Sequence, residues 1–497
     1  METELKFQVP PARAAALQRA VGTASARSVR LRASYADTAD QRLAAAGLAL
    51  RLRKEGRIWV QTLKGRGDGL MQRLEHEVEL PPQAGEPVLD PRRHAGTPAG
   101  EMLALALADG AELRTLYRTD IRRLHRRVRH GGATIEVAYD QGRIMAGDRT
   151  VPVNEVEFEL VSGPPAALPQ LAARWARRFG LWWDVRPKSE RGLRLALRRD
   201  TVPPVKAAAI ALPAAAGPHD AWQVVLLAAL SQALPNAAEI AAGTDTPEHL
   251  HQLRVALRRL RSALRWFADW GGDAAAAHAL EAEWREPFGS LGAARDSDVL
   301  THSLQPALDA AGAPPFSWPA SAAGVGPGEV VRSAEFTALL LRTLVLALAP
   351  AAAAQAGAPT LRAAAGAVLR RAWRRVMRDA AGFSAATVEE QHRTRKRLKR
   401  FRYGLEFLTP LLPARRTARL LKAVTLALEA LGELNDLHTA EARFRENAAL
   451  DPKAWFAVGW VRARQDGVRS AAASALARLA RMDGKALPWR RLRHGKD

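Results

Sequence analysis

The sequence contains no cysteine among its 497 residues. This absence excludes disulfides, thiolate nucleophiles and cysteine-ligated metals. It also fits a reducing compartment, where disulfides are rare. Any catalytic chemistry in this chain must therefore use oxygen and nitrogen side chains.

A convincing membrane-spanning segment is also lacking. The best candidate, TALLLRTLVLALAPAAAA from Thr337, is interrupted by Arg342 and Pro350, so it predicts a buried helix with a terminator. The start carries Glu2 and Glu4, where a secretory signal would need positive charge and then an apolar run. We therefore expect a soluble, cytoplasmic protein without a membrane partner.

Acidic residues are too few to balance the basic ones. The chain has 74 Lys and Arg against 51 Asp and Glu, a formal net charge of +23. Such an excess predicts a polyanionic partner: nucleic acid, polyphosphate or an acidic membrane surface. Arginine greatly outnumbers lysine, which suits bidentate contacts to phosphate.

The chain changes character near its middle. Residues 1–200 contain short alternating runs such as IWVQTLKG, ATIEVAYDQG and NEVEFELVSG, separated by turn residues, and predict strands. An Ala/Pro-rich stretch at 201–218 predicts a semi-rigid linker. From there to residue 495 the apolar residues recur at helical spacing. We therefore predict an α+β protein with a β-rich domain at 1–200 and an all-α domain at 219–495.

The helical half contains an internal repeat. HQLRVALRRLRSALRWF from His251 aligns with HRTRKRLKRFRYGLEFL from His392, and LGAARDSDV from Leu291 aligns with LGELNDLHT from Leu431. Two motifs that share nearly one offset indicate a duplicated bundle. We place the two repeats at roughly 219–350 and 360–495.

Charged residues alternate along several predicted strands. Glu2, Glu4 and Lys6 share one face of the first strand, and for one strand alone a solvated face is the simpler interpretation. Further strands repeat the pattern, with Arg51 and Arg53, with Glu75, Glu77 and Glu79, and with Glu155, Glu157 and Glu159. If the sheet closes into a barrel, these faces converge on a polar lumen.

A lumen of this kind needs ligands of both signs. Clustered carboxylates need a cation, and hard oxygen ligands select Mg²⁺ or Mn²⁺. The lysines and arginines need an anion. A metal–polyphosphate substrate satisfies both sets at once.

These motifs resemble the CYTH family, the triphosphate tunnel metalloenzymes. ETELK matches the family's E-x-E-x-K signature, and YADT, LAAAGLALRLR, WVQTLKG, RLEHEVEL, NEVEFELVSG and KSERG follow in family order over residues 1–200. The resemblance implies an eight-stranded antiparallel β tunnel, or barrel. It also implies hydrolysis of triphosphate-type substrates with a divalent metal.

The resemblance also implies roles for single residues. The implied metal ligands are Glu2, Glu4, Glu155, Glu157 and Glu159, and the first four join Lys6 as the implied catalytic set. The implied phosphate-binding residues are Lys6, Arg51, Arg53, Lys64, Arg73 and Arg123. Glu75 and Glu77 would orient these cations or a second metal, and Lys188 would cover the tunnel end. Arg126 and Leu193 replace aromatic residues that are common in relatives, which bears on substrate choice.

The resemblance implies a reaction without a protein nucleophile. Metal and cations neutralise the phosphates while an in-line water attacks the terminal phosphorus. The expected substrate is inorganic triphosphate, which would yield diphosphate and phosphate. A different tunnel reaction stays open, either adenylate cyclisation or thiamine triphosphate hydrolysis. A non-catalytic protein that binds or targets polyphosphate is a further alternative.

Two basic stripes mark the helical half. A solvated charge face is the simpler interpretation, but like charges at helical spacing destabilise a helix, and both repeats carry the stripe. The motifs resemble the CHAD domain over about 216–495, which implies duplicated four-helix bundles with a basic groove for long inorganic polyphosphate. The expected groove residues are His251, Arg254, Arg258, Arg261, His392, Arg395, Lys399 and Arg402. Asp296 and Asp436 are expected to hold neighbouring arginines, and His249 and His438 to be bystanders.

Nucleic acid is a weaker fit to the stripes than polyphosphate. Base stacking needs aromatic rings interleaved with the cations, and the stripes contain only Trp266, Phe401 and Tyr403. We therefore expect no specific nucleic acid partner. The sequence leaves the oligomeric state and any association with polyphosphate granules open.

Overall fold

The computed structural model describes residues 2–493 except 68, 82, 84, 109, 214, 300–303, 317–324, 352–358 and 483–486. For residues 66, 293–299, 491 and 493 it describes the backbone only. The chain forms two compact units. The first unit comprises 1–206, 230–253 and 327–349, and the second comprises 207–229, 254–326 and 350–497. The expected domain boundaries at 200 and 218 stay predictions.

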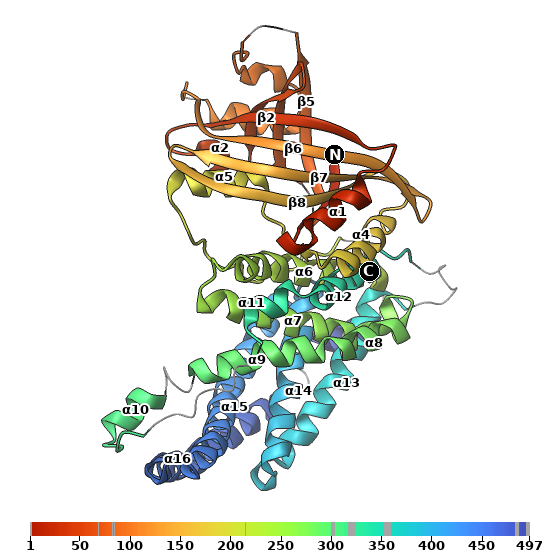
Figure 1. Cartoon of the computed structure of the whole chain (residues 1–497). Helices are drawn as coiled ribbons and strands as arrows, with labels where there is room; N and C mark the ends of the chain where they lie inside the picture. Colours follow the sequence, from red (N-terminus) through yellow and green to blue (C-terminus); the bar gives the residue numbers. More distant parts are fainter. Residues whose placement is uncertain are drawn as a thin grey trace. The chain divides into compact units, whose positions relative to one another are not determined.

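The first unit is built on an antiparallel barrel. Its strands are β1 (Glu2–Gln8), β2 (Arg27–Asp37), β3 (Ala49–Glu55), β4 (Ile58–Arg66), β5 (Gln72–Leu80), β6 (Arg114–His130), β7 (Ala133–Ala146) and β8 (Arg149–Ser162). The order is β5-β4-β3-β2-β6-β7-β8-β1, and pairing of β1 with β5 closes the ring (Figure 1). The short β9 (Trp182–Trp183) adds to β1. The predicted eight-stranded barrel is confirmed.

The register of β1 fixes which side chains enter the barrel. Glu4 lies opposite Glu159 and Lys6 opposite Glu157 on β8, while Glu2 lies opposite Arg73 on β5. Because side chains alternate along a strand, the charged residues of β1 share the inner face. The apolar residues between them point outward.

Helices bury the apolar outer face of β1 and β8. Phe7 and Phe158 are fully buried, and their rings meet edge to face with centroids 5.7 Å apart. Trp175 of α4 (Ala167–Phe179) packs on Phe158 at 5.7 Å. Burying such an aromatic ring contributes roughly 1.5–3 kcal/mol. The wall formed by β1 and β8 is therefore charged on its inner face and apolar under the helices.

The apolar run from Thr337 forms α12 (Ala334–Ala347), which packs on α4 and is largely buried. At 14 residues it is too short to cross a bilayer. Among the described helices, α6 (Pro218–Ala242) has the length and composition of a span, and 72% of its apolar window is buried.

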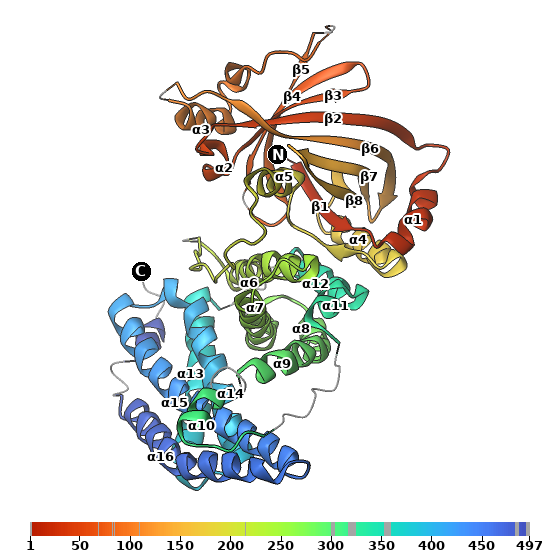
Figure 2. The ribbon, with the colours of Figure 1, turned by 60° about the vertical axis from the view of Figure 1, so that its left-hand side comes forward.

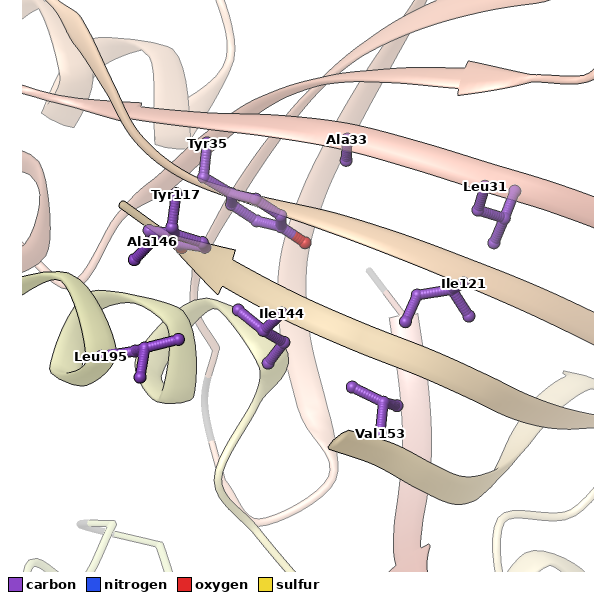
Figure 3. Packing of buried hydrophobic residues seen from close by; sticks show 9 residues of the cluster. All are labelled: Leu31, Ala33, Tyr35, Tyr117, Ile121, Ile144, Ala146, Val153 and Leu195. Carbon is purple, nitrogen blue, oxygen red and sulfur yellow. The ribbon is translucent and has the colours of Figure 1, made fainter. Parts of the chain in front are cut away.

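An apolar cluster, which Figure 3 shows, lies inside one end of the barrel. Tyr35 and Tyr117 stack there with centroids 4.7 Å apart, and Leu195 of α5 (Lys188–Leu197) packs on the same cluster. A Cβ added at Gly192 would overlap the Tyr117 ring. The close approach of α5 to the barrel therefore requires glycine at this position.

Three further helices lie on the barrel unit: α1 (Ala14–Val21), α2 (Arg42–Ala45) and α3 (Pro98–Ala106). Leu43 of α2 and Leu103 of α3 pack with Leu50 of β3 and Leu63 of β4 in one apolar cluster. Figure 2 shows α2 and α3 beside these strands. This second covered face explains why Leu50 of β3 and Leu63 of β4 are apolar, whereas the buried Gln61 on the same side of β4 bonds to Asp90 and His94.

The rest of the chain is mostly helical, as predicted. Its helices are α7 (Pro247–Trp266), α8 (Ala274–Glu283), α9 (Arg285–Val299), α10 (Gln305–Ala310), α11 (Pro327–Arg332), α13 (Leu361–Ala381), α14 (Val388–Phe407), α15 (Ala414–Ala448) and α16 (Trp455–Ala480). Helices α13 to α16 pack in a cycle, each on the next and α16 on α13, and form a four-helix bundle. The repeated basic motifs lie on α7 and α14.

Candidate active site and basic helical surface

The barrel encloses a cavity of about 620 Å³ with charged walls. The expected site residues that line it are Glu2, Glu4, Lys6, Arg51, Arg53, Lys64, Arg73, Glu75, Glu77, Arg123, Glu157, Glu159 and Lys188. Glu155 is fully buried and contacts Lys188, which lines the cavity. The structure thus brings the expected tunnel residues together, and their roles stay predictions.

One side of the cavity carries more negative charge than the protein itself neutralises. Lys64 binds Glu2 at 2.7 Å and Glu75 at 3.1 Å. Burial and the charges of Glu157 and Glu2 still raise the pKa of Glu4. A cation bound next to such a carboxyl group would favour its charged form and lower its pKa.

Two more carboxylates on this side are perturbed in the same way. Burial, with the charges of Glu2 and Glu136, raises the pKa of Glu159 to about 7. Burial, only partly offset by Lys64, raises the pKa of Glu75 to about 8. These oxygen donors fit a hard divalent cation. The pKa of Glu2 is instead lowered, because Lys64 outweighs the effect of burial, and the metal-ligand roles of Glu2, Glu4 and Glu159 stay predictions.

A second acidic cluster is already neutralised. Oxygens of Asp140, Glu155 and Glu157 all lie within 4.8 Å of one another. Lys188 Nζ contacts them at 2.7, 2.5 and 2.8 Å. Arg123 also donates to both Asp140 oxygens at 2.7 Å and contacts Glu157.

These cations decide the ionisation of the second cluster. Burial alone would raise the pKa of Glu157, but Lys188 and Arg123 hold it well below its ordinary value. Because the Lys188 ammonium already lies among the three carboxylates, the metal-ligand roles of Glu155 and Glu157 stay predictions.

The expected wall cations have defined partners. Arg51 donates to the Tyr35 hydroxyl at 3.1 Å, and Arg53 donates to Glu77 at 3.1 Å. Lys6 donates to the carbonyl of Arg186, and burial lowers the pKa of its ammonium.

The two departures from the family pattern lie in different places. Leu193 lines the cavity, so it can affect substrate choice. Arg126 is not among the cavity-lining residues and donates to the Ala20 carbonyl at 3.1 Å.

Sequence reasoning missed several wall residues. Glu136 and Asp140 of β7 line the cavity, as do Glu55 and His125, and His125 lies 3.3 Å from Glu136. The sequence contained a signal for these residues, because Glu136 and Asp140 in ATIEVAYDQG are an even number of residues apart and therefore share one face of the strand.

In the second unit, cations of α7 gather around one aromatic ring. Arg254, Arg258 and Arg261 lie 5.7, 5.4 and 5.2 Å from the centroid of Phe288. Arg254 also donates to the Gly292 carbonyl at 3.0 Å. Contact with the ring face stabilises these guanidinium groups, so three like charges can lie close together.

Lys399 of α14 lies in this basic environment. Burial and the charges of Arg258 and Arg395 lower the pKa of Lys399 to about 6, although Asp436 opposes this. Asp436 therefore acts on a lysine of the stripe. The side chain of Asp296 lies outside the described residues.

Two expected groove cations are paired with acids. Arg261 binds Glu281 at 2.8 Å, and Arg402 binds Glu406 at 2.7 Å. The charge of Arg261 also lowers the pKa values of Lys396 and Arg400, two cations that sequence reasoning did not select. Burial and the charge of Arg265 lower the pKa of Arg400 to about 10.

The histidines occupy different settings. His392 Nδ1 lies 2.5 Å from Asn435 Oδ1, and His392 and His438 line one cavity of about 330 Å³. His249 accepts a bond from the Thr246 backbone at 2.9 Å, which caps α7. His251 belongs to the first compact unit, and its expected role stays a prediction.

Comparisons with known proteins match two successive parts of the chain. Residues 1–181 match the CYTH domain model, and residues 224–445 match the CHAD domain model. This chain is a CYTH domain followed by a CHAD domain. The family resemblance predicted from the motifs is confirmed.

Named relatives cover one domain each. The inorganic triphosphatase of Haemophilus influenzae is 31% identical over 133 residues, 26% of this chain and 36% of that protein. The chain thus matches about a third of the length of this curated relative.

Solved structures resemble each domain separately. The CHAD domain from the plant Ricinus communis is 29% identical, covers 56% of this chain and 97% of that one, and gives a TM-score of 0.46. A putative adenylyl cyclase from Hippeastrum, described as having a dominant triphosphatase activity, is 19% identical. It covers 41% of this chain and 98% of that one, with a TM-score of 0.30.

Proposed function

We propose that the CYTH tunnel hydrolyses inorganic triphosphate to diphosphate and phosphate with Mg²⁺ or Mn²⁺. The observation that carries the proposal is one enclosed cavity with opposed charges. Its walls bring phosphate-binding cations and carboxylates of raised pKa within one volume of about 620 Å³. The name of the Haemophilus influenzae relative favours inorganic triphosphate over ATP or thiamine triphosphate.

The side chains divide the work by charge. The guanidinium groups of Arg51, Arg53 and Arg73 suit bidentate contacts to phosphate oxygens. Glu2, Glu4 and Glu159 would hold the metal. When bound, it would neutralise phosphate charge and make water a better nucleophile. Because the walls enclose the substrate, these electrostatic contacts act in a low dielectric and are strong.

A substrate panel tests this function. We expect the wild type to release phosphate from tripolyphosphate with Mg²⁺ or Mn²⁺, and Glu4→Gln to reduce turnover by about 100-fold or more, since it removes a metal-binding charge. Glu101→Gln on α3 is the control, because Glu101 is exposed and is not among the cavity-lining residues. Full activity of Glu4→Gln would refute the assignment. Faster cyclisation of ATP, or faster hydrolysis of thiamine triphosphate, would assign the tunnel a different substrate.

We further propose that the CHAD domain binds long inorganic polyphosphate. The support is the cluster of Arg254, Arg258, Arg395 and Lys399 on α7 and α14, whose mutual repulsion a polyanion would relieve. A competition assay tests it: long-chain polyphosphate should stay bound when RNA is added at equal phosphate concentration. Displacement by RNA would overturn the choice of ligand.

A further inference from the structure

A buried ion pair joins α5 to α6 within the first compact unit. Arg194 donates to both oxygens of Glu239, at 2.9 and 2.8 Å. The Glu239 side chain is 3% exposed and that of Arg194 is 13% exposed. Glu239 lies in the segment that matches the CHAD family, whereas Arg194 follows the CYTH match.

One branch from Glu239 leads to Lys6. Arg186 Nη1 lies 3.8 Å from Glu239, and the same guanidinium makes two bonds of 2.9 Å to the buried Asp184. The carbonyl of Arg186 accepts from the Lys6 ammonium. Glu239 is therefore separated from a cation of the tunnel wall by one residue.

A second branch runs along α5. Lys188, Arg191 and Arg194 follow at three-residue spacing and share one side of the helix. Lys188 contacts the acidic cluster of the tunnel, Arg191 binds Glu155 at 2.7 Å, and Arg194 binds Glu239. The same helix is fixed by Leu195 in the apolar cluster (Figure 3).

Glu239 is itself held in place. Thr244 donates to its carboxylate at 2.7 Å. One turn earlier on α6, Asn236 bonds to the backbone of Val205 in both directions, at 3.1 and 2.9 Å. A buried carboxylate is costly unless it is paired, so removing its charge would disturb both arginines.

We propose that Glu239 is a positioning residue for the tunnel. Through Arg194 it orients α5 and hence Lys188, and through Arg186 it places Lys6. The CHAD segment thereby supplies a part of the tunnel's support. This inference rests on the proposed function, because Lys6 is expected to bind substrate phosphate and Lys188 to cover the end of the tunnel.

Steady-state kinetics of the full chain on tripolyphosphate with Mn²⁺ tests the inference. We expect Glu239→Gln to raise KM about three- to tenfold, since misplaced cations bind phosphate less well. A purely structural role would lower kcat through a loss of folded protein and leave KM unchanged. Glu239→Asp keeps the charge and should restore part of the affinity. Glu248→Gln on α7, exposed and in the same unit, should keep the wild-type KM.

A second variant tests the inference if Glu239→Gln does not fold. Arg194→Lys keeps the charge but loses the bidentate geometry, and we expect the same rise in KM. A wild-type KM in the folded variants would overturn the inference. Absence of hydrolysis by the wild type would instead overturn the proposed function.

Discussion

At the scale of single residues, Lys188 puts one ammonium group among three carboxylates of the tunnel wall. Its side chain is 13% exposed, and those of Asp140 and Glu155 are fully buried. Burying three acids together is possible only because cations compensate them. Lys188 therefore acts as a fixed counter-ion of the fold, whatever its part in binding substrate.

Loss of that counter-ion should be costly. We expect Lys188→Met to reduce the free energy of unfolding by about 3–5 kcal/mol, because it leaves buried carboxylates uncompensated. Added Mn²⁺ should restore part of the loss, since the vacated acidic cluster can then bind a cation. Thermal unfolding with and without Mn²⁺ measures both effects. Lys206→Met, at an exposed site, is the control, and an unchanged Tm for Lys188→Met would contradict the interpretation.

We expect Lys399 to make the proposed polyphosphate binding sensitive to pH. Its pKa of about 6 lies far below the ordinary value of 10.5, because of burial and of Arg258, Arg395 and Arg254, with Asp436 opposing. Above pH 6 the free protein therefore holds the amine neutral, and binding a polyanion requires proton uptake. Affinity should fall as pH rises from 6 to 8, by at most about tenfold per unit.

The sign for stability is opposite. The unfolded chain keeps the proton that folded Lys399 loses, so the free energy of unfolding rises as pH increases above about 6.

Calorimetric titration with polyphosphate in two buffers would measure the proton uptake on binding. Lys399→Arg stays charged and should flatten the pH dependence, whereas Lys422→Arg, exposed on α15, should not. A wild-type affinity that is independent of pH would contradict this prediction.

Single-residue patterns predicted the tunnel wall well but incompletely. Period-two alternation placed Glu2, Glu4 and Lys6 on one face, and the same rule would have found Glu136 and Asp140. Ionisation could not be predicted in this way. The pKa of Glu75 rises to about 8 through burial, which depends on strands that are distant in sequence.

At the scale of elements, the crossing of α7 and α14 depends on one glycine. A Cβ at Gly404 would overlap the ring of Trp266, with the nearest atoms on its six-membered ring. The two helices carry the repeated basic motifs, and the charge of Arg258 acts on Lys399. We therefore expect this close approach to affect the spacing between these two cations. A larger residue would separate them.

Overpacking this crossing tests its importance. We expect Gly404→Ala to reduce the free energy of unfolding by about 1–3 kcal/mol and to weaken polyphosphate binding. Gly459→Ala on α16 is the matched control, because nothing lies within 4 Å of its added Cβ. Alanine there should be neutral or stabilise by up to about 1 kcal/mol. Denaturant unfolding compares the two, and equal stabilities would contradict the proposed packing.

Strand elements were easier to predict than helix faces. Alternation assigns a strand residue to one of two faces, and the barrel followed from it. In HRTRKRLKRFR nearly every face of the helix carries a cation, so spacing could not separate Arg402, which pairs with Glu406, from Lys396 and Arg400. Only the packing of α14 makes that choice.

At the scale of the whole molecule, a net charge of +23 should make polyphosphate binding strongly dependent on salt. If about six cations contact the polymer, affinity should fall by about three orders of magnitude between 50 and 200 mM salt. Tripolyphosphate offers fewer charges and should show a smaller change. Binding titrations across salt concentrations measure both slopes, and a salt-independent affinity for the long polymer would contradict a charge-based site.

The closure of the barrel by β1 has a consequence for biosynthesis. Its partner β8 is made about 150 residues later, as the pairing of Glu4 with Glu159 records. At ribosomal speeds, the first strand therefore waits roughly 8–30 s for its neighbour. During that interval Leu5 and Phe7 lack the cover of β8 and α4, although Lys64 and Arg73, which contact Glu2 and Glu4, are made earlier. We expect chaperones to meet the nascent chain at this stage.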